Sequence, residues 1–100
     1  MAVIIQYTKQ ALKGKTALTQ NERDILAALE QDMRETGGKP LGRGWASLGP
    51  LRQYAKNAYH CHFTRNKVAV WLITSGETED EIRAVFCRFE YVGSRGQAPY

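Results

Sequence analysis

The sequence predicts an α+β fold, in which two N-terminal helices pack on one face of a mostly antiparallel sheet of four to five strands. Three observations lead to this class: an apolar run opens the chain, a helical periodicity follows, and strand-like runs fill most of residues 59–91. A chain of 100 residues fits one core, so we expect a single domain over residues 1–100.

The chain opens with a predicted strand, AVIIQY at residues 2–7, and a short helix that begins at Lys9 and is broken at Gly14. The opening run lacks a basic start and a cleavage-like region, so we interpret it as a strand and not as a secretion signal. No run is long and apolar enough to span a membrane. Cys61 and Cys87 lie in apolar strand-like runs. We therefore expect free buried thiols and a cytoplasmic location.

The second helix carries the clearest local signal. TQNE is a capping box, with Thr19 as the N-cap and Glu22 three residues later, and Gly37-Gly38 ends the helix. The apolar positions at helical spacing are Ile25, Leu26, Leu29 and Met33. The Gly/Pro-rich segment GGKPLGRGWASLGP, residues 37–50, is predicted to be a long loop of the kind that often carries function.

The second half of the chain is rich in predicted strands. Residues 59–64 and 67–74 flank Arg65-Asn66, a plausible two-residue hairpin turn, and residues 82–91 form a further strand after a charged loop. The hairpin register places one set of side chains in the core: Tyr59, Cys61, Phe63, Val68, Val70 and Leu72. The other face then carries His60, His62, Ala69 and Trp71. On the last strand, Val85, Cys87, Phe89 and Tyr91 share one face.

Charge is unevenly distributed along the chain. The net charge is +4, yet all acidic residues fall within residues 22–35 and 77–90. This layout favours one face for an anionic partner over a merely solvated surface. The basic candidates for binding RNA or phosphate are Lys39, Arg43, Arg52, Lys56, Arg65, Lys67 and Arg88.

The motif YHCHFTR, residues 59–65, holds both histidines of the chain. Strand alternation puts His60 and His62 on one face and Cys61 on the other, so a zinc site would lack ligands and we expect no metal. Buried thiols are also poor nucleophiles. The segment GRGWASLG lacks the Lys-Ser/Thr of a phosphate-binding loop.

Acid–base cleavage of RNA needs no metal, because the 2′-hydroxyl of the substrate can act as the nucleophile. Histidine titrates near neutral pH and can serve as base or acid, and arginine suits the charge that develops on the phosphate. His60, His62, Arg65, Arg88 and Arg95 can supply these roles. The alternative for each arginine is a solvated group or one that only positions phosphate.

The order of elements and three segments, YHCHFTR, KVAVWLI and YVGSRGQAPY, resemble the RelE/ParE toxin superfamily over nearly the whole chain. By this resemblance, His60 and His62 stand where RelE-type ribonucleases carry two catalytic basic residues, and Arg95 stands at the tail arginine that holds the scissile phosphate. Tyr100 stands where some members carry an aromatic residue that orients the nucleotide. Val68 occupies a position where the pattern usually has arginine.

The resemblance implies the toxin of a type II toxin–antitoxin system, which cleaves messenger RNA on the ribosome and so inhibits translation without a cofactor. It also implies a cognate antitoxin partner with an acidic, partly disordered segment. ParE-like relatives share the fold but inhibit DNA gyrase, so a gyrase-directed toxin remains an alternative. A small basic nucleic-acid-binding module is the other alternative.

Overall fold

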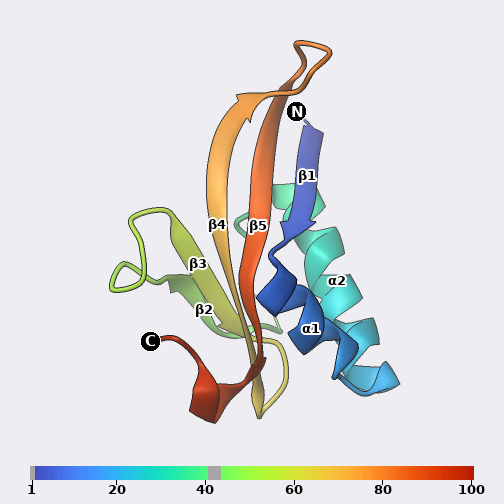
Figure 1. The fold of residues 1–100 in the computed structure, drawn as a ribbon, viewed down its shortest axis with the longest axis vertical. Helices are drawn as coiled ribbons and strands as arrows, with labels where there is room; N and C mark the ends of the chain where they lie inside the picture. Colours follow the sequence, from blue (N-terminus) through green and yellow to red (C-terminus); the bar gives the residue numbers. More distant parts are fainter. Residues whose placement is uncertain (1, 41–43) are drawn as a thin grey trace.

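Five strands and two α-helices make up the protein, as the computed structural model in Figure 1 shows; it describes residues 2–40 and 44–100. In chain order the elements are β1 (Ala2–Tyr7), α1 (Lys9–Thr16), α2 (Gln20–Thr36), β2 (Ala46–Pro50), β3 (Ala58–His62), β4 (Lys67–Glu77), β5 (Arg83–Ser94) and the 3₁₀ helix η1 (Arg95–Gln97). The strands lie in the order β1-β5-β4-β3-β2, with β1 parallel to β5 and the other pairs antiparallel. The predicted α+β class is confirmed.

The first helix packs directly on the sheet. Thr8 caps α1 by accepting the N–H of Ala11 at 3.1 Å, and the helix runs to Thr16 without interruption, so the predicted break at Gly14 is wrong. A Cβ atom at Gly14 would lie 1.7 Å from the carbonyl oxygen of Val92 in β5. The glycine therefore serves the close approach of helix and strand rather than ending the helix.

The second helix follows its sequence signals. The Thr19 hydroxyl accepts the N–H of Glu22 at 3.2 Å, and the Glu22 carboxylate accepts the N–H of Thr19 at 2.9 Å, which confirms the capping box. The helix ends at Gly37, which adopts the left-handed conformation with φ of 68°. No helix among the described residues is long and apolar enough to cross a membrane.

The face of the sheet under the helices buries the main core. Trp71 of β4 is fully buried there, with its ring centroid 5.7 Å from that of Phe89 and 6.1 Å from that of Tyr59. Its indole N–H donates to the carbonyl of Gly38 at 3.0 Å, which ties the centre of the sheet to the end of α2. The fully buried side chains that α2 contributes are Leu26, Leu29 and Met33.

A buried carboxylate joins β1 to both helices. Glu30 of α2 is only 9% exposed and accepts a hydrogen bond from the Tyr7 hydroxyl. The Lys15 ammonium of α1 lies 3.6 Å from the same carboxylate and 4.7 Å from the centre of the Tyr7 ring. Burial, with the hydrogen bond to Glu30, raises the pKa of Tyr7 well above its ordinary value, so the phenol stays a neutral donor.

The register between β3 and β4 differs from the prediction by one residue. Cys61 pairs with Ala69 and Tyr59 with Trp71, because Phe63 has no partner in the ladder, whose last pair is His62 and Val68. Ala69 and Trp71 therefore belong to the core, and their predicted place beside the histidines is wrong. The side chains that share the open face with the histidines are Val68, Val70 and Leu72.

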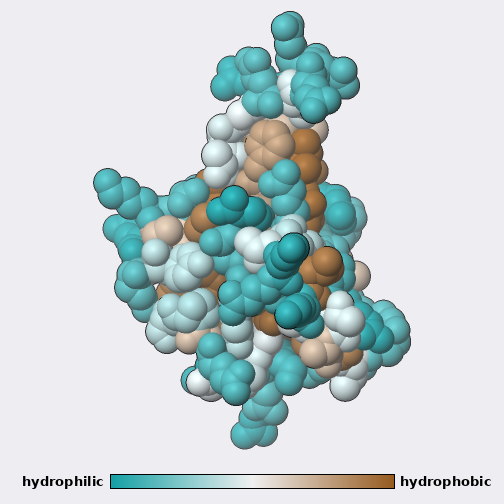
Figure 2. Space-filling model, in the orientation of Figure 1, coloured by the Kyte–Doolittle hydropathy of each residue, from teal (hydrophilic) through white to brown (hydrophobic). Residues whose placement is uncertain are grey.

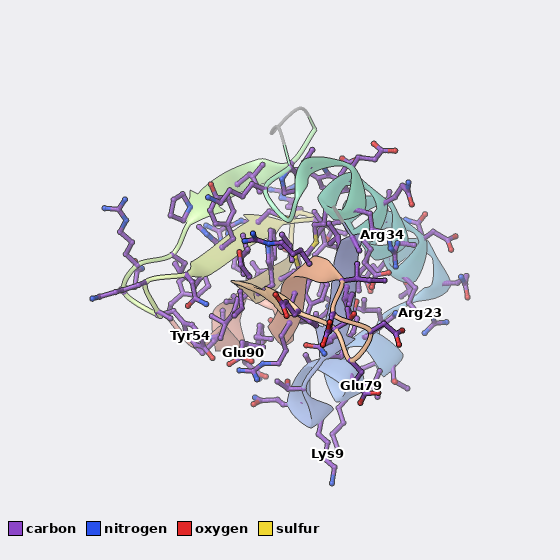
Figure 3. All side chains as sticks on the ribbon, turned by 90° about the horizontal axis from the view of Figure 1, so that it is seen from above. Lys9, Arg23, Arg34, Tyr54, Glu79 and Glu90 are labelled. Atoms are coloured by element: carbon purple, nitrogen blue, oxygen red, sulfur yellow. The ribbon has the colours of Figure 1, made fainter. Side chains whose placement is uncertain are left out.

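A bulge in β5 moves a second predicted residue. Val70 pairs with Tyr91 and Trp71 with Phe89, so Glu90 is the extra residue. Tyr91 consequently packs on the open face, and its predicted place in line with Phe89 is wrong. A small second core forms on that face from Leu51, Ala58 and Val70, with Tyr54, Ala55, Leu72 and Tyr91 around it. Tyr54 lies beside Glu90 in Figure 3, and its hydroxyl donates to the carboxylate at 3.1 Å.

The segment predicted as one long loop contains the edge strand β2. Gly49 pairs with His60 and Ala46 with His62, with an irregularity between these pairs and a positive φ of 53° at Ser47. Tertiary pairing with β3 creates this strand, because the Gly/Pro-rich sequence has little strand preference of its own. Arg43 lies outside the described residues.

Strands β4 and β5 form a long hairpin that projects beyond the rest of the sheet (Figure 1). Its turn follows Glu77, later than predicted, because β4 continues through residues expected in a charged loop. Figure 2 shows hydrophilic side chains gathered at this end of the molecule. The acidic residues there are Glu77, Glu79, Asp80 and Glu81, and all are exposed.

The tight contact at Gly14 can be tested by adding one methyl group. We expect Gly14→Ala to lower the free energy of unfolding by about 1–3 kcal/mol, despite the better helix propensity of alanine, because α1 must move away from β5. Urea unfolding measures the change. Gly96→Ala is the matched control, since its Cβ would meet only the Ser94 hydroxyl, at 3.9 Å, and a similar loss in both variants would contradict the expectation.

Candidate active site on the open face of the sheet

Strand β3 presents both histidines on the face of the sheet opposite the helices. His60 and His62 are partly exposed, while Cys61 between them is fully buried in the main core. The two imidazole rings lie edge to face, with centroids 6.1 Å apart. The predicted alternation therefore separates the thiol from the histidines and leaves two titratable groups side by side.

The edge strand β2 fixes the ring of His60. Its Nδ1 lies 3.0 Å from the carbonyl oxygen of Gly49, and because a carbonyl only accepts hydrogen bonds, Nδ1 carries a proton. In the neutral ring Nε2 is then the atom that can exchange a proton with a ligand. Sequence reasoning missed this role for Gly49, because every residue has a backbone carbonyl and residue type does not reveal which one will accept the bond.

The C-terminal tail closes over the histidines. The Arg95 N–H donates to the carbonyl of Asn66 at 2.8 Å, so the β3–β4 turn holds the start of the tail. The Tyr100 ring then lies edge to face with His60, at 5.4 Å between centroids, and its hydroxyl lies 3.4 Å from Nε2 of His62. The structure thus brings three of the predicted site residues into contact, although 38 positions separate Tyr100 from His62.

The surroundings shift the proton equilibria of the site. Partial burial lowers the pKa of His62, and the nearby positive charges of Arg95 and His60 lower it further. Partial burial also raises the pKa of Tyr100, so its hydroxyl is neutral near pH 7. Burial raises the pKa of Cys61 to about 12 and that of Cys87 to about 11, which leaves both thiols protonated and unreactive.

The predicted phosphate-binding residues do not form one group. Lys67 lies 3.8 Å from the Glu22 carboxylate on the helix side, and Arg88 lies 2.8 Å from Glu90 in an ion pair that partly neutralises it. Arg65 is exposed in the turn next to Asn66, which holds the tail. Lys39, Arg52 and Lys56 gather around a separate cavity near the start of β3.

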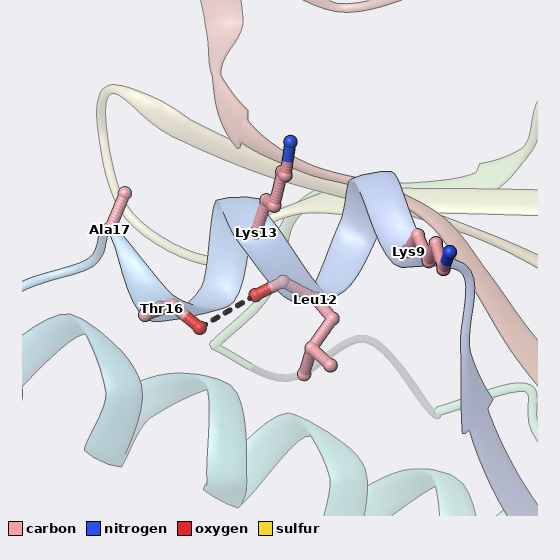
Figure 4. A pocket seen from close by; sticks show the side chains of 5 residues that line it. All are labelled: Lys9, Leu12, Lys13, Thr16 and Ala17. Carbon is pink, nitrogen blue, oxygen red and sulfur yellow. Dashed lines mark hydrogen bonds between the residues drawn. The ribbon is translucent and has the colours of Figure 1, made fainter.

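Another cavity, of about 430 Å³, lies on α1 and not beside the histidines (Figure 4). Leu12 and the aliphatic parts of its neighbours line it, and the Thr16 hydroxyl, which donates to the Leu12 carbonyl at 2.9 Å, is tied to the helix backbone. Its charged groups, Lys9 and Lys13, offer no acid–base pair. Across residues 2–40 and 44–100, no three His, Cys, Asp or Glu side chains are grouped to hold one metal ion.

Known structures share this fold. No protein-family model matches the chain, and no curated protein matches it. A metal-bound toxin from Helicobacter pylori is 20% identical with a TM-score of 0.63, over 97% of this chain and 98% of that one. YafQ from E. coli strain BL21(DE3) is 21% identical with a TM-score of 0.58, over 92% of each chain. A YoeB/ParE toxin from Agrobacterium tumefaciens is 15% identical with a TM-score of 0.61, over 88% of this chain and 99% of that one. The chain has the RelE-like toxin fold.

The electrostatic coupling within the site can be measured directly. We expect the pKa of His62, followed by NMR of its imidazole protons, to lie below the ordinary histidine value and to rise in Arg95→Gln, because a nearby positive charge is removed. Arg88→Gln is the control, since Glu90 already pairs with that guanidinium. An unchanged His62 pKa in Arg95→Gln would contradict the coupling.

Proposed function

We propose that this chain is the toxin of a toxin–antitoxin pair and that it cleaves messenger RNA, in the ribosome and in the cytoplasm, without a metal ion. The observation that carries the proposal is the contact of His60, His62 and Tyr100 on the open face, beside Arg95. Its fold, shared with several proteins named as toxins, supports the toxin role. The partner would be a cognate antitoxin.

Cleavage needs one proton removed and one proton supplied, and each histidine performs one of these transfers. His62, whose lowered pKa keeps its ring neutral near pH 7, takes the proton from the 2′-hydroxyl of the substrate. The 2′-oxygen then attacks the adjacent phosphorus, and the bond to the 5′-oxygen of the next nucleotide breaks. His60 enters this step as the imidazolium, with a proton on each ring nitrogen; it gives the Nε2 proton to the leaving oxygen and becomes neutral, while Nδ1–H still donates to the Gly49 carbonyl. The products are a 2′,3′-cyclic phosphate and a free 5′-hydroxyl.

Arg95 and Tyr100 would act on the phosphate and the base. Arg95 is exposed, and its positive charge acts on His62, so it can stabilise the extra negative charge of the pentacoordinate phosphorus. Tyr100 is 43% exposed, so one side of its ring remains available to stack on a nucleobase. Its hydroxyl, 3.4 Å from Nε2 of His62, would give way to the 2′-hydroxyl when RNA binds.

Cleavage of messenger RNA in a translating system tests this function. We expect wild-type protein to produce discrete primer-extension stops on ribosome-bound messages, and His60→Ala and His62→Ala each to lower the cleavage rate about 100-fold or more, because each removes one proton transfer. Gln31→Ala, on the exposed side of α2, should cleave as wild type does. Intact message with wild-type protein, or undiminished cleavage by both histidine variants, would refute the proposal. Inhibition of gyrase supercoiling with intact message would instead favour a gyrase-directed toxin.

The pH dependence of cleavage separates the roles of the two histidines. Because His62 must be neutral to act as the base, the rate should fall as the pH drops through its lowered pKa, below the ordinary 6.5. Arg95→Gln should move this acidic limb to higher pH in addition to lowering the rate. Single-turnover rates between pH 5 and 8 measure both effects, and an acidic limb that stays in place would argue against His62 as the base.

A further inference from the structure

A cavity of about 310 Å³ lies at the start of β3, away from the tail that covers the histidines. Three cationic side chains line it, Lys39 after α2 and Arg52 and Lys56 from the segment between β2 and β3. Tyr59 and Ile73 form part of its wall. A cavity of this size, bounded by charged groups and one aromatic ring, can hold a single nucleotide unit.

The segment that carries Arg52 and Lys56 is held firmly in place. The Leu51 N–H donates to the Ala58 carbonyl at 2.9 Å, and the buried Leu51 side chain anchors the segment in the second core. At its other end the Asn57 carbonyl accepts the N–H of Ile73 at 3.0 Å, and the Asn57 side-chain amide donates to the Ile73 carbonyl at 3.0 Å. The two cations therefore project from a fixed frame, which reduces the entropy lost when an anion binds.

In the described part of the chain, no carboxylate forms an ion pair with these cations. Among the described residues, the three ion pairs involve Lys15, Lys67 and Arg88, so no carboxylate lies within 4 Å of the charged groups of Lys39, Arg52 or Lys56. Residues 36–76 of the sequence contain no Asp or Glu at all. The Lys39 ammonium lies 5.9 Å from the centre of the Tyr59 ring. The cavity is thus a concentration of positive charge with capacity for an anion.

The cavity is adjacent to the histidines along the edge of the sheet. Pro50 pairs with Tyr59 in its wall, and the next pair along β2 and β3 is Gly49 with His60. Strand residues advance about 3.3 Å each, so Ala58 and His62 are roughly 13 Å apart along β3. Because β2 is a five-residue edge strand, an extended chain can pass over it from one site to the other.

We propose that this cavity binds phosphate groups of the same single-stranded RNA whose scissile bond lies at His60 and His62. The inference rests on the proposed function and adds a second contact point on the substrate. Arg52 and Lys56 pair with phosphate oxygens, Lys39 with a neighbouring phosphate, and the Tyr59 ring borders the nucleotide. Tyr59 and Ile73 in the cavity wall belong to the helix side of the sheet, so the RNA would pass around the edge strand β2 to reach the histidines on the other face. RNA is favoured over an acidic protein because the cavity lies one residue pair from His60 along β2 and β3, within reach of the strand that would be cut.

Binding can be measured apart from cleavage with a fluorescent 12-nucleotide 2′-O-methyl RNA, which lacks the nucleophilic hydroxyl. We expect Lys39→Gln/Arg52→Gln/Lys56→Gln to bind it about tenfold more weakly or worse, and the slope of log affinity against log salt to shrink by about 2. The control, Lys9→Gln/Lys13→Gln/Arg34→Gln, removes the same charge from exposed positions of α1 and α2 and should bind nearly as wild type. Circular dichroism checks that both variants fold.

Each result decides the inference independently of catalysis. Equal losses in both triple variants would show an effect of net charge only and overturn it, as would wild-type affinity in the cavity variant. A loss of affinity for polyglutamate with unchanged RNA binding would assign the cavity to an acidic protein and also overturn it. If the cavity variant loses RNA binding while wild type cleaves no RNA, the site stands and the proposed function fails. If cleavage depends on the histidines but the cavity variant binds RNA as wild type does, the proposed function stands and the cavity site fails.

Discussion

The inward position of Trp71 is the constraint on which the rest of the structure depends. The indole is the largest fully buried side chain, and its N–H has to reach an acceptor, which the carbonyl of Gly38 provides at 3.0 Å. This bond holds the end of α2 over the middle of β4. With that face of β4 committed to the core, the pairing of Tyr59 with Trp71 turns the alternate residues of β3 outward. Trp71 must point into the core, so Tyr59 opposite it does the same, and His60 and His62 therefore point to the open face.

Small irregularities in the sheet then complete the open face. Leaving Phe63 out of the ladder allows the β3–β4 turn to bend so that Asn66 can accept the N–H of Arg95. The bulge at Glu90 brings Tyr91 to the same face, where it packs around the second core and supports the segment between β2 and β3. Neither feature adds a chemical group to the site. Both set the positions of the backbone segments that carry those groups, as bulges near functional surfaces often do.

Local signals in the sequence predicted the elements well, and long-range pairing limited the rest. The capping box at Thr19, the bounds of β1 and the separation of Cys61 from His60 and His62 each depend on neighbours within a few residues, so they could be derived from residue order alone. The predicted register of the β3–β4 hairpin was wrong because the sequence does not distinguish a two-residue turn from the same turn with one additional unpaired residue, here Phe63. The predicted helix break at Gly14 was wrong because this glycine allows close contact with β5, a strand that is distant in sequence. Within the candidate site, the side chains could be predicted from residue type and from the family resemblance. The contact of the Gly49 carbonyl with His60 could not, because it depends on the pairing of β2 with β3.

The projecting β4–β5 hairpin holds a cluster of negative charge apart from the cationic cavity. Its exposed acidic residues, Glu77, Glu79, Asp80 and Glu81, lie at the hydrophilic end of the hairpin (Figures 1 and 2). The cationic cavity lies instead at the start of β3, and Arg95 lies in η1, which follows the other end of β5. In the field of a polyanion such a molecule experiences a torque as well as an attraction, which turns the acidic hairpin away before any contact forms. For the RNA partner proposed above, this torque would orient the molecule before contact, an effect that the net charge of +4 alone does not describe.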